Sequence, residues 1–193
     1  YRLRSPKDRK KFTADDYKEA KPHLNGRERT TLSDYDNAIL YNDSVVDQIC
    51  KRFEDREAIV IYVPDHGEEC YEGDMHFFCR LHSAKVDARL AHAEFDIPFW
   101  IWCSHKYAVR HPQVFRQVVA ARNRRFMTDA LPHLLLYLGG IATPQYRERY
   151  NVLSPHYDVG RRRMLKNKVD YDELRRNYEA GSAGDGPADR VAH

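Results

Sequence analysis

Apolar side chains recur at helical spacing between Thr30 and Glu54, and a short continuous apolar run follows this stretch. Polar residues occupy the positions between them, as in an amphipathic helix that packs on a core. Thr31 or Ser33 supplies an N-cap, and acidic residues in the first turn suit the helix dipole. The pattern therefore predicts a helix that ends near Glu54, with an apolar stripe formed by Tyr35, Ala38, Ile39, Val45, Val46, Ile49 and Phe53.

The continuous run from Ala58 to Val63 is rich in β-branched residues and is too short for a helix. It predicts a strand buried on both faces, as in a parallel sheet with helices packed on each side. Pro64 has no amide hydrogen to give to a ladder, so the strand ends there. The helix followed by this strand indicates the second half of a βαβ unit.

The rest of the chain continues the alternation of strands and helices. The run Phe95–Trp102 predicts a second buried strand, and helices are expected over Pro112–Arg122 and Asp129–Leu138. The sequence from Thr143 onward is basic and loop-rich. Glycine, serine, alanine and aspartate dominate from Ala180, which predicts a disordered tail over residues 180–193. The pattern as a whole indicates an α/β fold.

Composition narrows the class of protein. The chain has 193 residues, 42% of them hydrophobic, and a net charge of +3, which is too small to imply a nucleic-acid partner. No apolar run reaches the roughly 18 residues of a membrane span. Residues 1–29 are strongly basic, and they form either a solvated loop or a positive rim that attracts anionic headgroups. The chain begins at Tyr1, without a methionine, and we expect it to be part of a longer protein.

The cysteines contain no C-x-x-C pair, which argues against a zinc–thiolate site. Cys50 and Cys103 lie in apolar surroundings and are expected to be buried thiols. Cys70 and Cys79 form a disulfide if the segment between them folds back, and two unpaired thiols are the alternative.

The candidate metal-binding residues lie where the first predicted strand ends. Asp65 and His66 follow Pro64 directly, and Gly67 allows a sharp turn that can aim both side chains at one point. That point lies beyond the carboxyl end of a strand, where open α/β sheets bind their ligands. An oxygen and a nitrogen ligand side by side suit zinc and, less well, manganese. The alternative is an ordinary turn in which Asp65 bonds its own backbone.

Several stretches together resemble bacterial phosphoethanolamine transferases, which belong to the alkaline phosphatase/sulfatase superfamily. Tyr35–Asp43 is similar to the helix before the metal-binding strand, Val63–Glu69 to the metal motif, and Ile97–Trp102 to the following strand. Asn151–Pro155 and the pair Tyr171-Asp172 resemble the C-terminal end of the branch that modifies the lipopolysaccharide core. The resemblance covers the chain from Tyr1 to about Tyr178.

The resemblance implies a three-layer α/β/α sandwich of alkaline phosphatase/sulfatase type, of which residues 1–179 form the C-terminal half. It implies a catalytic domain that faces the periplasm and is anchored in the bacterial inner membrane. The implied reaction moves phosphoethanolamine from phosphatidylethanolamine to lipopolysaccharide, on lipid A or a core sugar, through a threonine intermediate.

The same resemblance suggests roles for particular residues. Zinc, or alternatively manganese, is held in the family by the threonine, an upstream acid and an Asp-His pair, which corresponds here to Asp65 and His66. A histidine shortly beyond this motif contacts the phosphoryl group, which makes His76 and His82 the candidate substrate-binding residues. The spacing favours His76 over His82.

The chain departs from the family pattern because the nucleophilic threonine and the acidic ligand belong upstream of Tyr1. Thr30 and Thr31 lie on the helix before the metal strand and do not replace that threonine. The chain is therefore expected to be inactive alone. Two alternatives remain: another superfamily enzyme, such as a sulfatase or a phosphoglycerol transferase, and a non-catalytic module that binds a glycan or lipid. A C/S-x-P-x-R motif upstream would indicate a sulfatase.

Overall fold

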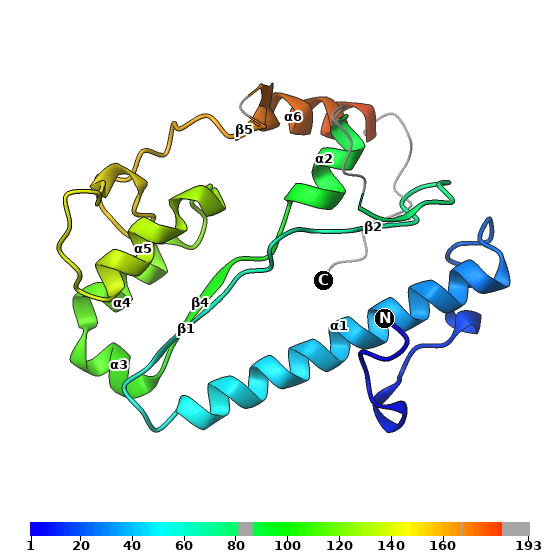
Figure 1. The fold of residues 1–193 in the computed structure, drawn as a ribbon, viewed down its shortest axis with the longest axis horizontal. Helices are drawn as coiled ribbons and strands as arrows, with labels where there is room; N and C mark the ends of the chain where they lie inside the picture. Colours follow the sequence, from blue (N-terminus) through cyan, green and yellow to red (C-terminus); the bar gives the residue numbers. More distant parts are fainter. Residues whose placement is uncertain (81–86, 167, 183–193) are drawn as a thin grey trace.

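The longest element of the fold is helix α1, Gly26–Phe53 (Figure 1). The computed structural model describes residues 1–80, 87–166 and 168–182. The helix begins four residues before the predicted start at Thr30, because Asn25 is its N-cap. The Asn25 side chain accepts hydrogen bonds from the amides of Arg27 and Glu28, and the Glu28 carboxylate accepts one from the Asn25 amide. This capping box fixes where the helix starts.

The central pair of strands is β1, Ile59–Tyr62, and β4, Trp100–Cys103. They pair antiparallel with Ile61 opposite Ile101, so the prediction of a parallel sheet is wrong for these two strands. All four residues of β1 are only partly buried, which also corrects the prediction of a strand buried on both faces. Only one strand pairs with β1 in the part of the chain that the structure describes.

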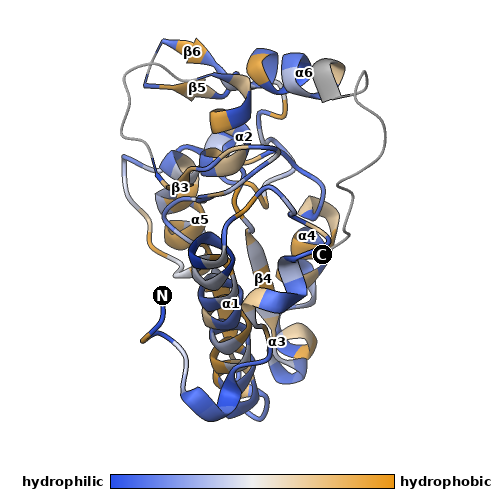
Figure 2. Ribbon diagram, turned by 90° about the vertical axis from the view of Figure 1, so that its right-hand side faces the viewer, coloured by the Kyte–Doolittle hydropathy of each residue, from blue (hydrophilic) through white to orange (hydrophobic). Residues whose placement is uncertain are grey.

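Helices lie on both sides of the β1–β4 pair, which confirms the predicted α/β/α arrangement (Figure 1). Helix α1 runs along one side. On the other side lie α4, Pro112–Ala121, and α5, Leu131–Leu138, whose ribbon is mostly hydrophobic in Figure 2. The core between strands and helices contains Ala121, Leu134, Val152, Leu153 and Tyr157, with Ile61, Phe99, Ile101 and Val118 packed against them.

Shorter elements connect and extend this centre. Helix α3, His105–Arg110, follows β4. Helices α2, Ala88–Phe95, and α6, Tyr171–Ser182, lie together at the opposite end of the molecule (Figure 1). Helix α2 occupies Ala88–Phe95, so β4 begins five residues later than the strand predicted from Phe95. The remaining elements are η1 Lys7–Arg9, η2 Ala14–Tyr17, β2 Glu69–Cys70, β3 Phe78–Cys79, η3 Thr128–Ala130, η4 Glu148–Tyr150, β5 Met164–Leu165, β6 Val169–Asp170 and α6 Tyr171–Ser182.

The predicted Cys70–Cys79 disulfide is wrong, because both thiols are free. Strands β2 and β3 do fold back on each other, but their register places Cys70 opposite Phe78 and Cys79 opposite Glu69. Residues directly opposite share a face of the ladder, so the two cysteines point to opposite faces. Cys70 is buried and Cys79 is exposed. Burial raises the pKa of the Cys70 thiol, which keeps it protonated.

The C-terminal region contains more order than its loop-rich sequence predicts. Helix α6 continues to Ser182, past the start of the predicted tail at Ala180, and residues 183–193 lie outside the described part of the chain. Among the described residues, no helix combines the length and the apolar composition needed to cross a lipid bilayer.

The basic N-terminal segment packs against α1 and is more than a solvated loop. Leu24 is 2% exposed, and the buried Asn37 of α1 holds the backbone of Lys11 and Phe12. The Asn37 carbonyl oxygen accepts hydrogen bonds from the amides of Lys11 (2.6 Å) and Phe12 (2.9 Å), and its amide nitrogen donates to the carbonyl of Phe12 (2.8 Å). The Asn37 side-chain amide both accepts from and donates to this backbone, as a paired strand would, and so anchors the segment to the helix.

We predict that Asn37→Ala lowers the free energy of unfolding by about 1–3 kcal/mol, because it leaves partly buried backbone groups of Lys11 and Phe12 without their partner. Asn123, exposed in the turn after the helix Pro112–Ala121 and without a side-chain hydrogen bond to any described residue, is the control, and Asn123→Ala should change the free energy of unfolding by less than about 0.5 kcal/mol. Urea unfolding measures both values, and hydrogen exchange should become faster at the amides of Lys11 and Phe12 only in Asn37→Ala. Equal stability of the two variants would contradict the proposed anchor.

Candidate functional site

Asp65 and His66 lie just beyond the end of β1 and face each other. The Nε2 atom of His66 is 3.5 Å from Oδ2 of Asp65. The other ring nitrogen, Nδ1, lies 2.7 Å from the carbonyl oxygen of Gly67. A carbonyl oxygen only accepts, so Nδ1 carries a hydrogen, and Nε2 is the ring nitrogen that is turned toward Asp65. The Asp65 side chain is 89% exposed and that of His66 is 30% exposed.

This geometry fits two ligands of one zinc ion. Ligand atoms at about 2.0–2.1 Å from a tetrahedral zinc are about 3.3–3.4 Å from each other, close to the separation of the two donor atoms here. The bond from His66 Nδ1 to a backbone carbonyl is the contact that usually orients a metal-binding imidazole. Among residues 1–80, 87–166 and 168–182, no group of three His, Cys, Asp or Glu side chains is placed to hold a metal. The structure therefore brings together two side chains of the types that bind zinc, Asp65 and His66.

Gly67 fixes the position of this pair because its backbone lies directly against α2. Its amide donates to the carbonyl of Glu94 at 2.8 Å. A Cβ atom added at Gly67 would lie 2.2 Å from the carbonyl oxygen of Ala93, closer than any side chain tolerates. The sequence predicts a glycine needed for a sharp turn, and the structure shows that close packing against α2 requires it.

A buried ion pair binds the same segment to α2 from the other side. Glu69 is fully buried, and its Oε2 lies 2.5 Å from a guanidinium nitrogen of Arg89 on α2. Its Oε1 accepts a hydrogen bond from the amide of Glu72 at 3.1 Å. Burial raises the pKa of Glu69, and the Glu72 amide and Arg89 oppose this effect. Gly67 and Glu69 thus attach the segment Asp65–Glu69 to α2 at two points.

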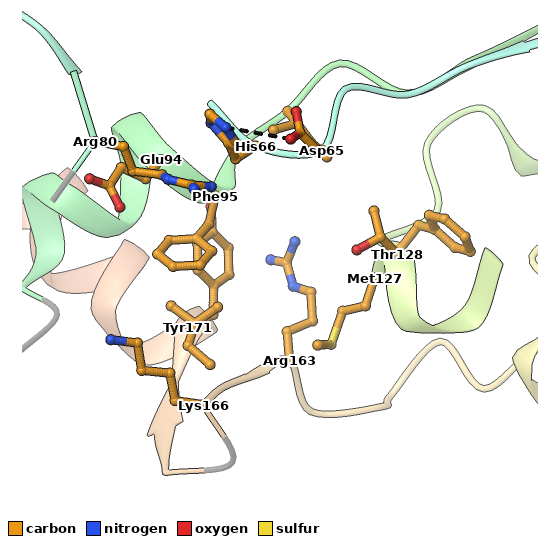
Figure 3. Close-up of a pocket in the computed structure, with 13 residues that line it drawn as sticks. Asp65, His66, Arg80, Glu94, Phe95, Met127, Thr128, Arg163, Lys166 and Tyr171 are labelled. Atoms are coloured by element: carbon orange, nitrogen blue, oxygen red, sulfur yellow. Dashed lines mark ion pairs between the residues drawn. The ribbon is translucent and has the colours of Figure 1, made fainter. Parts of the chain in front are cut away.

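A cavity of about 450 Å³ opens beside Asp65 and His66 (Figure 3). The Arg163 guanidinium projects into its middle, toward the side on which Asp65 and His66 lie, and Phe95 and Tyr171 form an aromatic wall (Figure 3). Two further basic residues and several apolar ones contribute, and the full lining is Asp65, His66, Arg80, Glu94, Phe95, Ile97, Phe126, Met127, Thr128, Arg163, Leu165, Lys166 and Tyr171.

Contacts from the C-terminal region hold Arg163 in place. Its Nε and Nη2 atoms lie 3.2 and 2.5 Å from Oδ1 of Asp172, and its guanidinium stacks 4.6 Å from the centre of the Tyr171 ring. The hydrogen bond from Arg163 is the main cause that lowers the pKa of Asp172, so this carboxylate stays charged. The Tyr171 hydroxyl donates to Asp96, next to α2. Arg163 is thus a pre-positioned cation beside the Asp65–His66 pair.

The structure does not bring the predicted substrate-binding histidine His76 to this cavity. His76 lies at the β2–β3 hairpin, its side chain is 57% exposed, and its Nδ1 is 2.9 Å from Oε1 of Glu28 on α1. The ring of His23 lies 5.7 Å from it, edge to face. His82, the other predicted substrate-binding residue, lies outside the described residues. The roles of both histidines stay predictions.

Sequence reasoning missed the basic and hydroxyl residues of the cavity. Arg163, Lys166 and Thr128 come from segments far along the chain from Asp65, and no spacing rule relates them to it. The consecutive arginines 161–163 were one available signal. Three like charges in a row are usually a solvated surface, yet one of these side chains is only 16% exposed and lines the cavity.

Comparison with known proteins gives matches along most of the chain. The Sulfatase family profile matches residues 4–140. Phosphoethanolamine transferase EptC of Escherichia coli O18:K1:H7 is 31% identical over 189 residues, which cover 94% of this chain and 31% of that protein. The Kdo(2)-lipid A phosphoethanolamine 7''-transferase of Salmonella typhimurium is 32% identical over 87 residues, which cover 44% of this chain and 14% of that protein. The chain thus spans less than a third of the length of these relatives.

Solved structures give the same assignment. The crystal structure of the C-terminal periplasmic domain of EptC from Escherichia coli matches with a TM-score of 0.72 and 29% identity, covering 90% of this chain and 49% of that one. The complex of that domain with zinc matches with a TM-score of 0.71 and 28% identity, covering 90% and 48%. These matches confirm the predicted fold of alkaline phosphatase/sulfatase type.

We predict that Gly67→Ala lowers the free energy of unfolding by about 1–3 kcal/mol, because the new methyl group overlaps the Ala93 carbonyl. Gly26 at the start of α1 is the matched control: no atom lies within 4 Å of an added Cβ. Gly26→Ala should leave stability unchanged or raise it by up to about 1 kcal/mol. Urea unfolding compares the two, and a Gly67→Ala variant as stable as the wild type would show that this close approach is absent in solution.

Proposed function

The chain belongs to the sulfatase family and is homologous to the phosphoethanolamine transferases, and from this premise we propose that it forms part of the active site of such an enzyme. The proposed reaction transfers phosphoethanolamine to an acceptor on lipopolysaccharide, either lipid A or a core sugar. The observation that carries the proposal is the Asp65–His66 pair, whose donor atoms have the separation of two zinc ligands and lie beside a cavity with a fixed cation.

Asp65 and His66 would hold zinc through Oδ2 and Nε2. Zinc supplies Lewis-acid chemistry, since it neutralises charge that builds up on phosphoryl oxygens and lowers the pKa of a bound hydroxyl. The hydrogen bond from His66 Nδ1 to the carbonyl of Gly67 keeps Nε2 free for the metal and fixes the ring. The attachment of Gly67 to α2 keeps both ligands where the cavity opens.

The charge, the aromatic residues and the volume of the cavity support phosphoethanolamine as its ligand. The Arg163 guanidinium is oriented by Asp172 and would donate hydrogen bonds to the phosphoryl oxygens. Phe95 and Tyr171 offer aromatic faces of the kind that attract an ammonium group such as that of ethanolamine. The volume of about 450 Å³ lies within the usual range for small-molecule sites, about 300–1,000 Å³.

The proposal assigns the remaining catalytic parts to residues outside this chain. Two ligands are fewer than the three protein ligands typical of catalytic zinc sites, so a nucleophilic threonine and an acidic ligand would complete the centre. In the proposed reaction, the bond from phosphorus to the glycerol oxygen of phosphatidylethanolamine breaks as a bond to threonine forms. The acceptor oxygen then displaces threonine from phosphorus. The setting would be the periplasmic face of the inner membrane, since the matched EptC domain is periplasmic.

We predict that His66→Ala, in the protein as the cell produces it, lowers zinc affinity by more than about 100-fold, and that Asp65→Ala also loses the metal, because each change removes one ligand. Zinc bound after equilibrium dialysis measures this effect, with phosphoethanolamine transfer as a second readout. His105→Ala is the control, since His105 is exposed on α3 and away from the site. Zinc content that is equal in His66→Ala and His105→Ala would contradict the proposed site.

The roles of the histidines form a separate prediction. His76→Ala is expected to lower the transfer rate more than His82→Ala, with zinc content nearly unchanged in both. A histidine that reaches the phosphoryl group would donate a hydrogen bond to it, and the spacing from Asp65 favours His76, which lies outside the cavity lining in this structure. Rates measured for both variants decide the matter. If His76→Ala transfers at the wild-type rate, His76 serves only to link the hairpin to Glu28.

A further inference from the structure

Asp96 follows helix α2 directly and lies, in the chain, between two residues that line the cavity beside Asp65 and His66. Its neighbours Phe95 and Ile97 line that cavity, whereas Asp96 borders an adjoining cavity of about 400 Å³. Asp96 is the C-cap residue of α2, and its side chain is 28% exposed. Any effect of Asp96 on a ligand beside Asp65 and His66 would therefore act through other residues.

Three donors converge on the Asp96 carboxylate. The Tyr171 hydroxyl donates to Oδ1. Oδ2 lies 2.9 Å from Nη1 of Arg175 and 3.0 Å from Nδ1 of His92. Tyr171 and Arg175 belong to α6, whereas His92 lies on α2, four residues before Asp96. One carboxylate thus attaches α6 to the end of α2, just before the chain continues into β4.

The contact with Tyr171 differs from the other two because Tyr171 is part of the cavity wall (Figure 3). The residue is 4% exposed, and the Arg163 guanidinium lies over its ring, 4.6 Å from the centre. The backbone amide of Tyr171 also donates to the carbonyl of Arg163 at 2.8 Å. A guanidinium over an aromatic face is attracted by the ring. Tyr171 is therefore held by Asp96 at its hydroxyl and supports Arg163 with its face.

The hydroxyl of Tyr171 remains a donor at physiological pH. Burial raises the pKa of this phenol, and the hydrogen bond to Asp96 raises it further. A buried hydroxyl without an acceptor is costly, so the ring keeps the orientation that reaches Asp96. The same orientation places the ring against Arg163.

The carboxylate of Asp172 alone does not fix the tilt of the Arg163 guanidinium. Both hydrogen bonds from Arg163 end on the same oxygen, Oδ1 of Asp172, at 3.2 and 2.5 Å. That oxygen also accepts from Arg125 at 3.1 Å. Two bonds to one oxygen restrain a guanidinium less than a bidentate pair with two oxygens does. The Tyr171 ring supplies the missing restraint, because its flat face limits how the guanidinium can turn.

We propose that Asp96 is a positioning residue of this site: through the Tyr171 hydroxyl it fixes the ring that orients Arg163, and it thereby sets the affinity of the cavity for a phosphoryl group. The proposal rests on the proposed transferase function for the identity of that group. Asp96 makes no contact with the substrate. Its ion pair with Arg175 serves to attach α6 and does not contribute to the orientation of Arg163.

Inorganic phosphate is the probe, because it presents the oxygens that Arg163 would bind and its binding needs no catalysis. Isothermal titration calorimetry measures its affinity for the protein. Asp96→Ala should weaken binding about 10-fold, close to the lower value for one charged hydrogen bond. Tyr171→Phe, which keeps the ring and removes only the hydroxyl, should weaken it by a similar factor. The double variant should bind no more weakly than Asp96→Ala, because both changes remove the same contact.

Two further variants separate this role from general support of the fold. Asp96→Asn retains an oxygen that can accept from Tyr171, and it should keep the affinity within about threefold of the wild type. Arg175→Gln breaks the ion pair between α6 and the same carboxylate but leaves Tyr171 in place, and it should keep the affinity within about twofold. Urea unfolding shows how much stability each change removes. If Arg175→Gln weakens phosphate binding as much as Asp96→Ala does, attachment of α6 explains both results and the proposal is overturned.

Neighbouring arginines locate the bound phosphate. Arg163→Gln should weaken binding about 100-fold, because it removes charged hydrogen bonds. Arg162 is 71% exposed and lies outside the cavity lining, so Arg162→Gln removes the same charge and should change the affinity by less than about twofold. Equal weakening by the two changes indicates non-specific attraction and overturns the proposal.

The same variants separate this proposal from the proposed transferase function. Zinc content should be unchanged in Asp96→Ala, because Asp96 is not part of the Asp65–His66 pair. If zinc and transfer prove absent but phosphate binding depends on Asp96 and Tyr171, the proposed reaction fails and the positioning role stands. If zinc binding and transfer occur as proposed but Asp96→Ala and Tyr171→Phe bind phosphate as the wild type does, the positioning role fails and the reaction stands.

Discussion

The close approach of Gly67 to α2 is the constraint on which the rest of the site depends. With no Cβ, this residue brings its amide to the Glu94 carbonyl, and a methyl group would overlap the Ala93 carbonyl. The contact bends the chain just after β1, so that the side chains of Asp65 and His66 lie 3.5 Å apart at the mouth of a cavity. The buried Glu69–Arg89 pair secures the same helix from β2.

Residues of the C-terminal region form another wall of the cavity beside Asp65 and His66. Asp172 holds Arg163, and the Tyr171 hydroxyl reaches Asp96 beside the end of α2. Segments about a hundred residues apart in the sequence thus meet around one cavity, and a fixed guanidinium faces the proposed metal ligands (Figure 3). Arg163 also lines an adjoining cavity of about 400 Å³. The arrangement supplies pre-organised positive charge, which is what phosphoryl transfer requires of a protein.

Local patterns explain what could be predicted from the sequence. Helix α1 was predictable from the helical spacing of its apolar residues, and strand β1 from its run of β-branched residues ending at Pro64. The pair Asp65-His66 stands out because it follows this strand directly. The antiparallel partner of β1 did not follow, because strand direction depends on the path of the intervening 37 residues, Val63–Phe99. The register between β2 and β3 was also not predictable from the sequence. It places Cys70 opposite Phe78 and Cys79 opposite Glu69, so the two thiols are on opposite faces of the hairpin. Cavity residues such as Arg163 came from tertiary contacts that no local signal encodes.

Anomalous X-ray diffraction at the zinc absorption edge, from crystals of the protein grown with zinc, tests the central claim most directly. The account predicts an anomalous peak about 2.0–2.2 Å from both Nε2 of His66 and Oδ2 of Asp65, with His66 Nδ1 still bonded to the Gly67 carbonyl. Zinc bound only elsewhere on the surface, with the Asp65–His66 pair unliganded at saturating zinc, would contradict it.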